Sequence, residues 1–91
     1  MLFTSDAVLG LADGSITLTF RTWTKRQAKV SGRYRTCGLL LEVHAMTRVD
    51  PRTINDADAR RAGSNTADDL RKKLGKPGPG DRVWRIEFRC L

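Results

Sequence analysis

The sequence predicts one small α+β domain, a β-barrel decorated by helices, spanning residues 1–91. Its 91 residues are too few for a second hydrophobic core. Stretches in which apolar and polar residues alternate recur at the beginning, middle and end of the chain, as expected for strands with one buried face. Strands this short bury their apolar faces only in a closed or half-closed sheet, so we expect a small barrel.

A short helix is expected before the first strand. In the stretch "FTSDAVLGLADG", Ser5 is placed to cap it, Asp6 suits the positive end of the helix dipole and Gly14 is a typical left-handed stop. Alternation then begins in "GSITLTFRTWTK", residues 14–25. It predicts a buried face and an opposite, wet face: Ile16, Leu18 and Phe20 on the first, and Thr17, Thr19 and Arg21 on the second.

Further strands are expected in the middle of the chain. Ser31-Gly32 reads as a turn that leads into the short strand "RYRTCG", in which Tyr34 is expected to be half in the core. The longest candidate is "LLLEVHAMTRV", residues 39–49, which Asp50-Pro51 ends because the residue before a proline is biased away from further regular structure.

Two helices are expected between this strand and the last one. Asn55 caps the first, "INDADARRAG", and Thr66 caps the second, "NTADDLRKKLG". The run Arg71–Lys73 reads as a solvated helix face. The chain closes with the strand "RVWRIEFRCL", in which Trp84 is in phase with the apolar residues and is therefore expected in the core.

The charge is strongly basic and concentrated. The chain has 17 Lys and Arg against 10 Asp and Glu, a net charge of +7 and a pI near 10.3. Segment 21–35 contains six basic residues and no acidic one, which favours a polyanionic partner over a merely solvated surface. The six are Arg21, Lys25, Arg26, Lys29, Arg33 and Arg35.

Several classes of site and location are disfavoured. One histidine, His44, and two distant cysteines, Cys37 and Cys90, supply no zinc ligand set, so we expect neither a metal nor another cofactor. No signal-peptide pattern and no apolar run of membrane-spanning length occurs. We therefore expect a cytoplasmic protein, not associated with a membrane, with free and buried thiols.

The order of elements and several motifs resemble the ASCH domain family, one of the PUA-like β-barrels. The family motif G-x-K-x-x-E-x-R maps onto residues 14–21, from Gly14 to Arg21. The closing "IEFRCL" is similar to small bacterial members that remove the acetyl group from N4-acetylcytidine. The resemblance covers about residues 7–91. It implies a PUA-like barrel of about five to six strands, with a short N-terminal helix and two helices inserted before the last strand.

This chain departs from the family pattern at key positions. Ile16 stands where the motif has lysine, and Thr19 where it has glutamate, although the amidohydrolase branch also has threonine there. The late helical glutamate of that branch aligns with Ala62 and Gly63, which carry no acid. The resemblance thus implies binding more readily than hydrolysis, with Thr19 as the catalytic residue only if the protein is an enzyme.

The sequence predicts a basic cleft beside the first strand that binds RNA or a nucleotide, with DNA as the alternative polyanion. Arg21 is expected to bind a phosphate or a base edge, and Trp23 is expected to stack on a base. In the competing interpretations Arg21 forms an ion pair with Glu42 or Glu87, and Trp23 closes the barrel core. The predicted binding residues are Thr17, Thr19, Arg21, Trp23, Lys25, Arg26, Lys29 and Arg33.

Two other functions stay open from the sequence. One is a hydrolase acting on nucleic-acid components, either an N4-acetylcytidine amidohydrolase or a ribonuclease. It requires a proton acceptor close to a hydroxyl or water in the cleft. The other is a protein-interaction module whose basic face meets an acidic partner.

Overall fold

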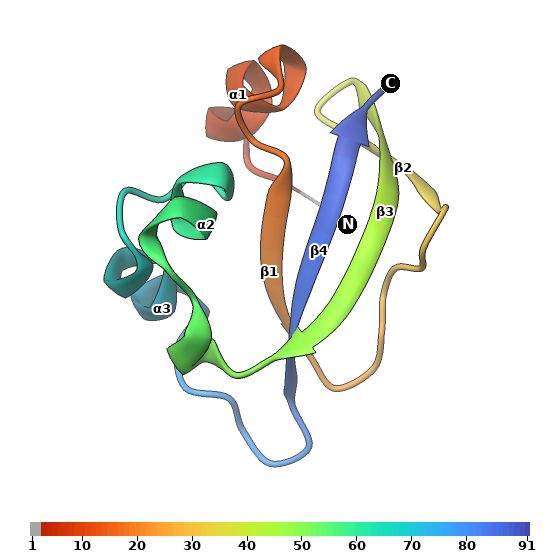
Figure 1. Ribbon diagram of the computed structural model, residues 1–91. Coiled ribbons are helices and arrows are strands. Elements are labelled where there is room, and N and C mark those ends of the chain that lie inside the picture. The colour runs from red at the N-terminus through yellow and green to blue at the C-terminus, as the bar shows by residue number, and fades with distance from the viewer. Residues whose placement is uncertain (1–2) are drawn as a thin grey trace.

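A computed structural model describes residues 3–91. These residues form an α+β fold in which four antiparallel strands make a curled half-barrel, in the order β1-β4-β3-β2 (Figure 1). The expectation of five to six strands is therefore wrong for the described residues, because segment 24–32 runs as a loop between β1 and β2. The strands are β1 (Leu18–Trp23), β2 (Arg33–Thr36), β3 (Leu39–Val49) and β4 (Arg82–Cys90).

The helices are short and occur where the sequence predicts them. One lies before β1, and two are inserted between β3 and β4 on one side of the sheet (Figure 1). None of the helices in residues 3–91 is long and apolar enough to cross a membrane. The helical elements are η1 (Ser5–Ala7), α1 (Val8–Asp13), η2 (Pro51–Thr53), α2 (Asp56–Arg61) and α3 (Ala67–Leu74).

The helix ends confirm most of the expected signals. Asn55 accepts a hydrogen bond from the Asp58 backbone N–H at 2.8 Å, and Thr66 accepts one from Asp69 at 3.1 Å, so both caps are correct. Gly14 ends α1 with a left-handed φ of 83°. The Ser5 cap is wrong, because Ser5 lies inside a 3-10 turn that has no side-chain cap.

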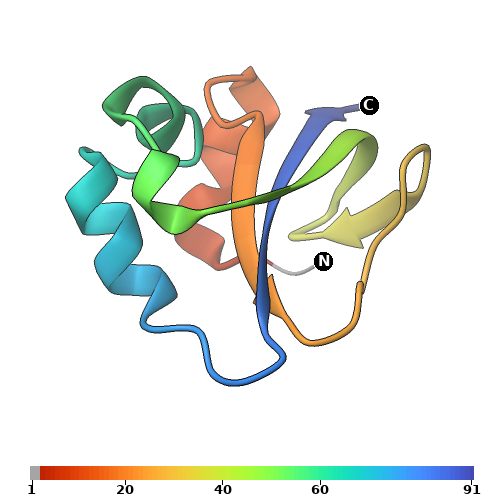
Figure 2. The ribbon, with the colours of Figure 1, turned by 60° about the horizontal axis from the view of Figure 1, so that its bottom comes forward.

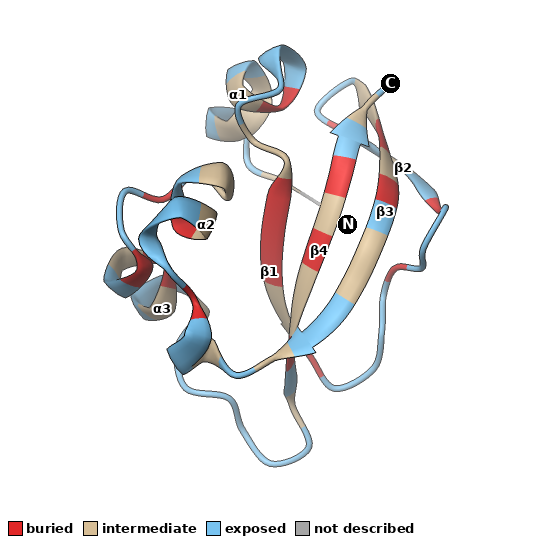
Figure 3. Cartoon of the chain, viewed as in Figure 1, coloured by how far each residue is buried: buried red, intermediate tan, exposed pale blue. Residues whose placement is uncertain are grey.

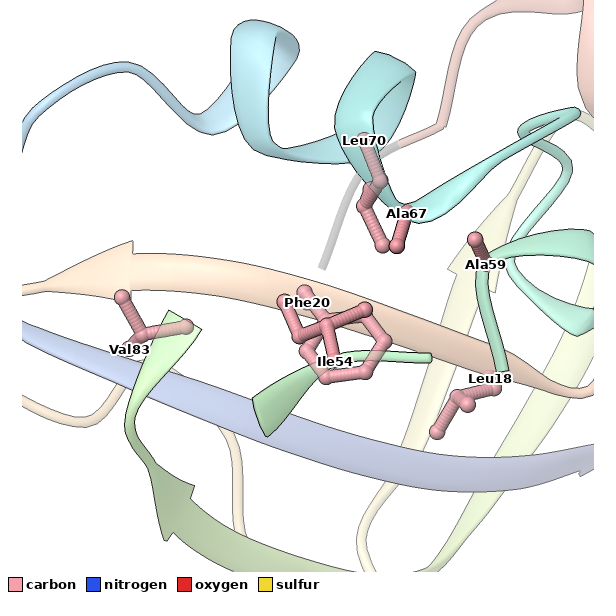
Figure 4. Packing of buried hydrophobic residues seen from close by; sticks show 7 residues of the cluster. All are labelled: Leu18, Phe20, Ile54, Ala59, Ala67, Leu70 and Val83. Carbon is pink, nitrogen blue, oxygen red and sulfur yellow. The ribbon is translucent and has the colours of Figure 1, made fainter. Parts of the chain in front are cut away.

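One face of the sheet is covered by α2 and α3, and we call it the helix face. Leu18 and Phe20 of β1 pack there against residues from both helices (Figure 4). Leu18 is completely buried, which makes this cluster a main source of stability. The cluster consists of Leu18, Phe20, Ile54, Ala59, Ala67, Leu70 and Val83.

The opposite face is covered in part by the loop 24–32, and we call it the loop face. This loop runs from the end of β1 to β2 (Figure 2). Ala28 of the loop is buried in a second cluster with Trp23, Val43 and Ile86. The loop therefore closes the concave side of the half-barrel where a longer sheet would otherwise be needed.

The predicted wet face of the first strand is not wet. Thr19 is only 8% exposed, and Thr17 and Arg21 are half-buried, so β1 is covered on both faces (Figure 3). The alternation correctly separates Leu18 and Phe20 from Thr19 and Arg21, since consecutive strand residues point to opposite faces. It does not reveal that the second face is covered as well.

The turn of the β2–β3 hairpin exposes one of the two cysteines. Its two-residue turn is Cys37-Gly38, with left-handed φ values of 51° and 77°, as a tight hairpin turn requires. Cys37 is exposed at this turn and Cys90 is half-buried, so the expectation of buried thiols is wrong. Both thiols are free.

Candidate nucleic-acid interface

A pocket of about 360 Å³ lies beside β1. Its walls come from the N-terminal segment, from β1 and the residues before it, and from the end of α2 and α3. Two of the predicted binding residues, Thr19 and Arg21, line it. Among residues 3–91, the pocket is lined by Phe3, Thr4, Asp6, Ala7, Ile16, Thr19, Arg21, Ala62, Gly63 and Lys73.

Arg21 is held in a fixed orientation within this pocket. Its Nε donates a hydrogen bond to the Thr19 hydroxyl at 3.1 Å, and its guanidinium carbon lies 4.8 Å from the centre of the Phe3 ring. Burial lowers the pKa of the Arg21 guanidinium, although an arginine remains charged at neutral pH. The pocket therefore contains a partly desolvated, oriented cation.

Lys73 brings a second cation to the pocket from α3. Its Nζ donates to the hydroxyl of Ser64, a residue only 5% exposed, at 3.1 Å. Lys73 is exposed, as expected for a solvated helix face, but the sequence pattern does not indicate that it also lines the pocket. Nothing in the local pattern distinguishes Lys73 from Lys72, since only the packing of α3 beside β1 brings one of them to the pocket.

Ile16 and Gly63 form an apolar wall. Ile16 stands where the family motif has lysine, and it lines the pocket with a hydrocarbon side chain instead of an amine. Gly63 has a left-handed φ of 85°, and a Cβ placed on it would lie 3.2 Å from Ile16 Cδ1. The left-handed backbone thus favours a glycine here, and a side chain at this position would also displace Ile16 slightly.

Thr17 does not line the pocket but belongs to an ion-pair network. Its hydroxyl accepts a hydrogen bond from Arg61 Nε at 3.2 Å, and Arg61 also approaches Glu87 at 3.4 Å. Arg85 binds the same Glu87 oxygen at 2.7 Å and also pairs with Asp58. The hydrogen bond from Arg85 holds the pKa of Glu87 below its usual value. This network ties α2 to β4 and to the start of β1.

The two tryptophans take different places from those predicted. Trp23 is only 8% exposed and packs in the loop-face cluster, so the alternative interpretation as a core tryptophan is correct. Trp84 packs against the same cluster but is only half-buried. The Arg26 guanidinium lies above its ring, 5.6 Å from the centre. Tyr34 is half-buried as expected.

The remaining predicted residues are exposed. Lys25, Arg26 and Lys29 lie on the loop 24–32, and Arg33 lies on β2. Since β1 and β2 are the two edge strands, Arg33 lies at the edge opposite Thr19 and Arg21.

Glu42 serves as the counterion of the β2 edge. Arg33 Nε donates to it at 3.0 Å, and Arg89 and His44 approach it at 3.5 Å. The hydrogen bond from Arg33 lowers the pKa of Glu42. Both strand carboxylates proposed as partners of Arg21, Glu42 and Glu87, are thus engaged by other arginines.

Neither a metal-ligand cluster within residues 3–91 nor a match to a known protein indicates what this pocket binds. Within residues 3–91, no three side chains of His, Cys, Asp or Glu gather so as to hold a metal ion. Comparison of the chain with models of protein families, with characterised proteins and with solved structures gives no match in any of the three. The function must be argued from the geometry.

Proposed function

We propose that this chain binds RNA or a nucleotide without turning it over, and that the pocket beside β1 holds one nucleotide unit. The observation that carries the proposal is Arg21, a partly desolvated guanidinium oriented by Thr19 inside the pocket. A guanidinium in such surroundings binds a phosphate or a base edge with two parallel hydrogen bonds.

The size and charge of the pocket support this proposal. A volume of about 360 Å³ lies within the range of small-ligand sites, which extends from roughly 300 to 1,000 Å³. Among residues 3–91, two cations, Arg21 and Lys73, line it against one carboxylate, Asp6, so the pocket favours an anionic ligand. Phe3 and Ile16 add an apolar surface suited to a base or ribose.

The distribution of charge along the chain also supports a polyanion. From residue 21 to residue 49 the chain carries seven lysines and arginines and one acid, Glu42. Lys25, Arg26 and Lys29 are exposed and form no ion pair within the described residues. Cations of this kind gain most from phosphates, because docking releases condensed counterions.

We also propose that the chain is a divergent ASCH-type domain of the PUA-like class that works in the cytoplasm. Support comes from the curled half-barrel, the N-terminal helix and the two helices inserted before the last strand. Motif positions Thr19 and Arg21 line the pocket together with Ile16, so the residues that carry the resemblance are close in space.

A hydrolase acting on nucleic-acid components is the second candidate. It is favoured by Lys73, because an amine from α3 lines the same pocket as the Thr19 hydroxyl and the Asp6 carboxylate. Binding without turnover remains the first proposal, since Thr19 accepts from Arg21 and Lys73 donates to Ser64. Release of cytidine from N4-acetylcytidine by the purified protein would reverse this order.

Binding is tested by fluorescence anisotropy of a labelled single-stranded RNA over a series of salt concentrations. We expect measurable binding at low salt and roughly tenfold weaker binding by Arg21→Ala, since charged hydrogen bonds contribute about 1.5–3 kcal/mol. Arg60→Ala is the matched control, because Arg60 is exposed on α2 outside the pocket. A wild-type protein that binds neither RNA nor nucleotides at low salt refutes the proposal.

A further inference from the structure

Trp84 lies in a row of side chains that crosses the loop face of the sheet. In the strand register Arg21 of β1 is opposite Trp84 of β4, and Arg48 of β3 is opposite Trp84 on the other side. Directly opposed residues of antiparallel strands project from the same face of the sheet. The indole of Trp84 is therefore flanked by one arginine on each neighbouring strand.

A third arginine reaches Trp84 from the loop. The Arg26 guanidinium lies 5.6 Å from the centre of the Trp84 ring, within cation–π range. Arg26 and Arg48 are both exposed, and neither forms an ion pair with any of residues 3–91. The part of Trp84 that remains accessible is thus adjacent to flat, cationic groups.

The acids nearest to Arg26 and Arg48 are engaged by other groups. Asp81, which directly precedes β4, accepts hydrogen bonds from the Thr24 hydroxyl at 2.6 Å and from the Gly78 backbone N–H at 3.0 Å. Asp50, just after β3, is paired with Arg52 at 2.7 Å. A cavity of about 320 Å³ at the end of the sheet is lined by Arg48 and Arg82 and also by Asp50.

We propose that Trp84 is the stacking platform for one unpaired base of single-stranded RNA, with Arg21, Arg26 and Arg48 binding the phosphates on either side. This inference rests on the proposed function and specifies how the RNA lies. Arg21 belongs both to the pocket and to this row, so the strand passes from the pocket onto Trp84. The base takes the place of the Arg26 guanidinium over the indole or stacks against that guanidinium.

The chemistry favours single-stranded RNA over the other polyanions. The acidic side chains of a peptide have no flat ring that could stack on the indole of Trp84, whereas every nucleobase has one. In a duplex the bases are already stacked on one another and are not available. Arginines on three different segments, around one ring, match phosphates spaced along a flexible strand.

The test compares three proteins by anisotropy with a labelled, unstructured oligouridine RNA of about 12 nucleotides. We expect Trp84→Leu to bind roughly tenfold more weakly than the wild type, and Trp84→Phe, which keeps a ring, to recover most of that loss. A duplex RNA of the same length is expected to bind more weakly than the single strand. Thermal unfolding of each variant confirms that it is folded at the assay temperature.

A second measurement needs no variant. Since Trp23 is buried, stacking on Trp84 is expected to quench the tryptophan fluorescence of the wild type upon addition of oligouridine but not of inorganic tripolyphosphate. Equal quenching by both, or wild-type affinity in Trp84→Leu, overturns the stacking role. If Arg21→Ala still weakens binding in that case, the proposed function stands alone. If the wild type binds no RNA, the stacking role is wrong, and if it binds no nucleotide either, the proposed function is wrong as well.

Discussion

The two faces of the sheet differ in whether their arginines form ion pairs. On the helix face, Arg85 and Arg61 are paired with Asp58 and Glu87 at distances of 2.7 to 3.7 Å. On the loop face, Arg26 and Arg48 form no ion pair within residues 3–91 and surround a half-buried tryptophan. The sheet is the same, but the segments that cover it differ.

The difference follows from what each covering segment supplies. Helix α2 brings Asp58 to the helix face, so the arginines there are neutralised within the protein and stabilise the fold. The loop 24–32 contains no acid, and its own cations add to those of β1 and β3. Arg26 and Arg48, which have no ion pair within residues 3–91, do not stabilise the fold in that way. The proposed binding therefore uses the loop face and the adjoining pocket, while the ion pairs of the helix face stabilise the fold.

The largest expected effect concerns the helix face. Leu18→Ala removes a fully buried side chain from the cluster of Figure 4 and is expected to lower the free energy of unfolding by about 2–5 kcal/mol. Urea denaturation measures this change. Val30→Ala, at a residue 50% exposed, is the control and is expected to change stability by less than about 0.5 kcal/mol. A small loss for Leu18→Ala would show that the helix face does not anchor the fold.

The next prediction concerns the loop face and its salt dependence. Each phosphate contact with a single strand contributes about 0.7 to the slope of log K against log salt. Arg26→Gln combined with Arg48→Gln is expected to make the slope shallower by roughly 1.4, with little change in the free energy of unfolding. Arg60→Gln combined with Lys76→Gln removes the same charge from exposed positions elsewhere. If both pairs change the slope equally, only net charge matters.

The smallest effect is a pH dependence on the helix face. Because the hydrogen bond from Arg85 lowers the pKa of Glu87 from 4.5 in the folded state, its stabilisation is present above about pH 4.5 and lost as the pH falls below it. Glu87→Gln is expected to cost about 1 kcal/mol at neutral pH, a modest value because the side chain is about one third exposed.

Thermal unfolding at about pH 7 and about pH 3 measures this dependence. One kcal/mol corresponds to a shift of about 4–8 °C in Tm for a domain of this size. The difference between wild type and Glu87→Gln is expected to narrow at the lower pH. A constant difference would mean that the ion pair is not the cause.

The tryptophans show how far a sequence pattern can be taken. Alternation correctly places Trp23 on the face of Thr19 and Arg21, and Trp84 on the face of Ile86 and Phe88. These are the same face of the sheet. The pattern does not say which part of that face the loop covers. It predicts Trp23 as the stacking ring and Trp84 as core, whereas Trp23 is buried and Trp84 is half-buried.

The caps at Asn55 and Thr66, the left-handed stop at Gly14, the order of the elements and the concentration of cations after β1 could be predicted from the chain alone, because they depend on residues near one another. The sequence could not indicate that Lys73 shares a pocket with Arg21, that the loop buries Trp23, or that three arginines surround Trp84. These relations join residues 5 to 63 positions apart, and such contacts are set by the packing of whole elements rather than by local preference.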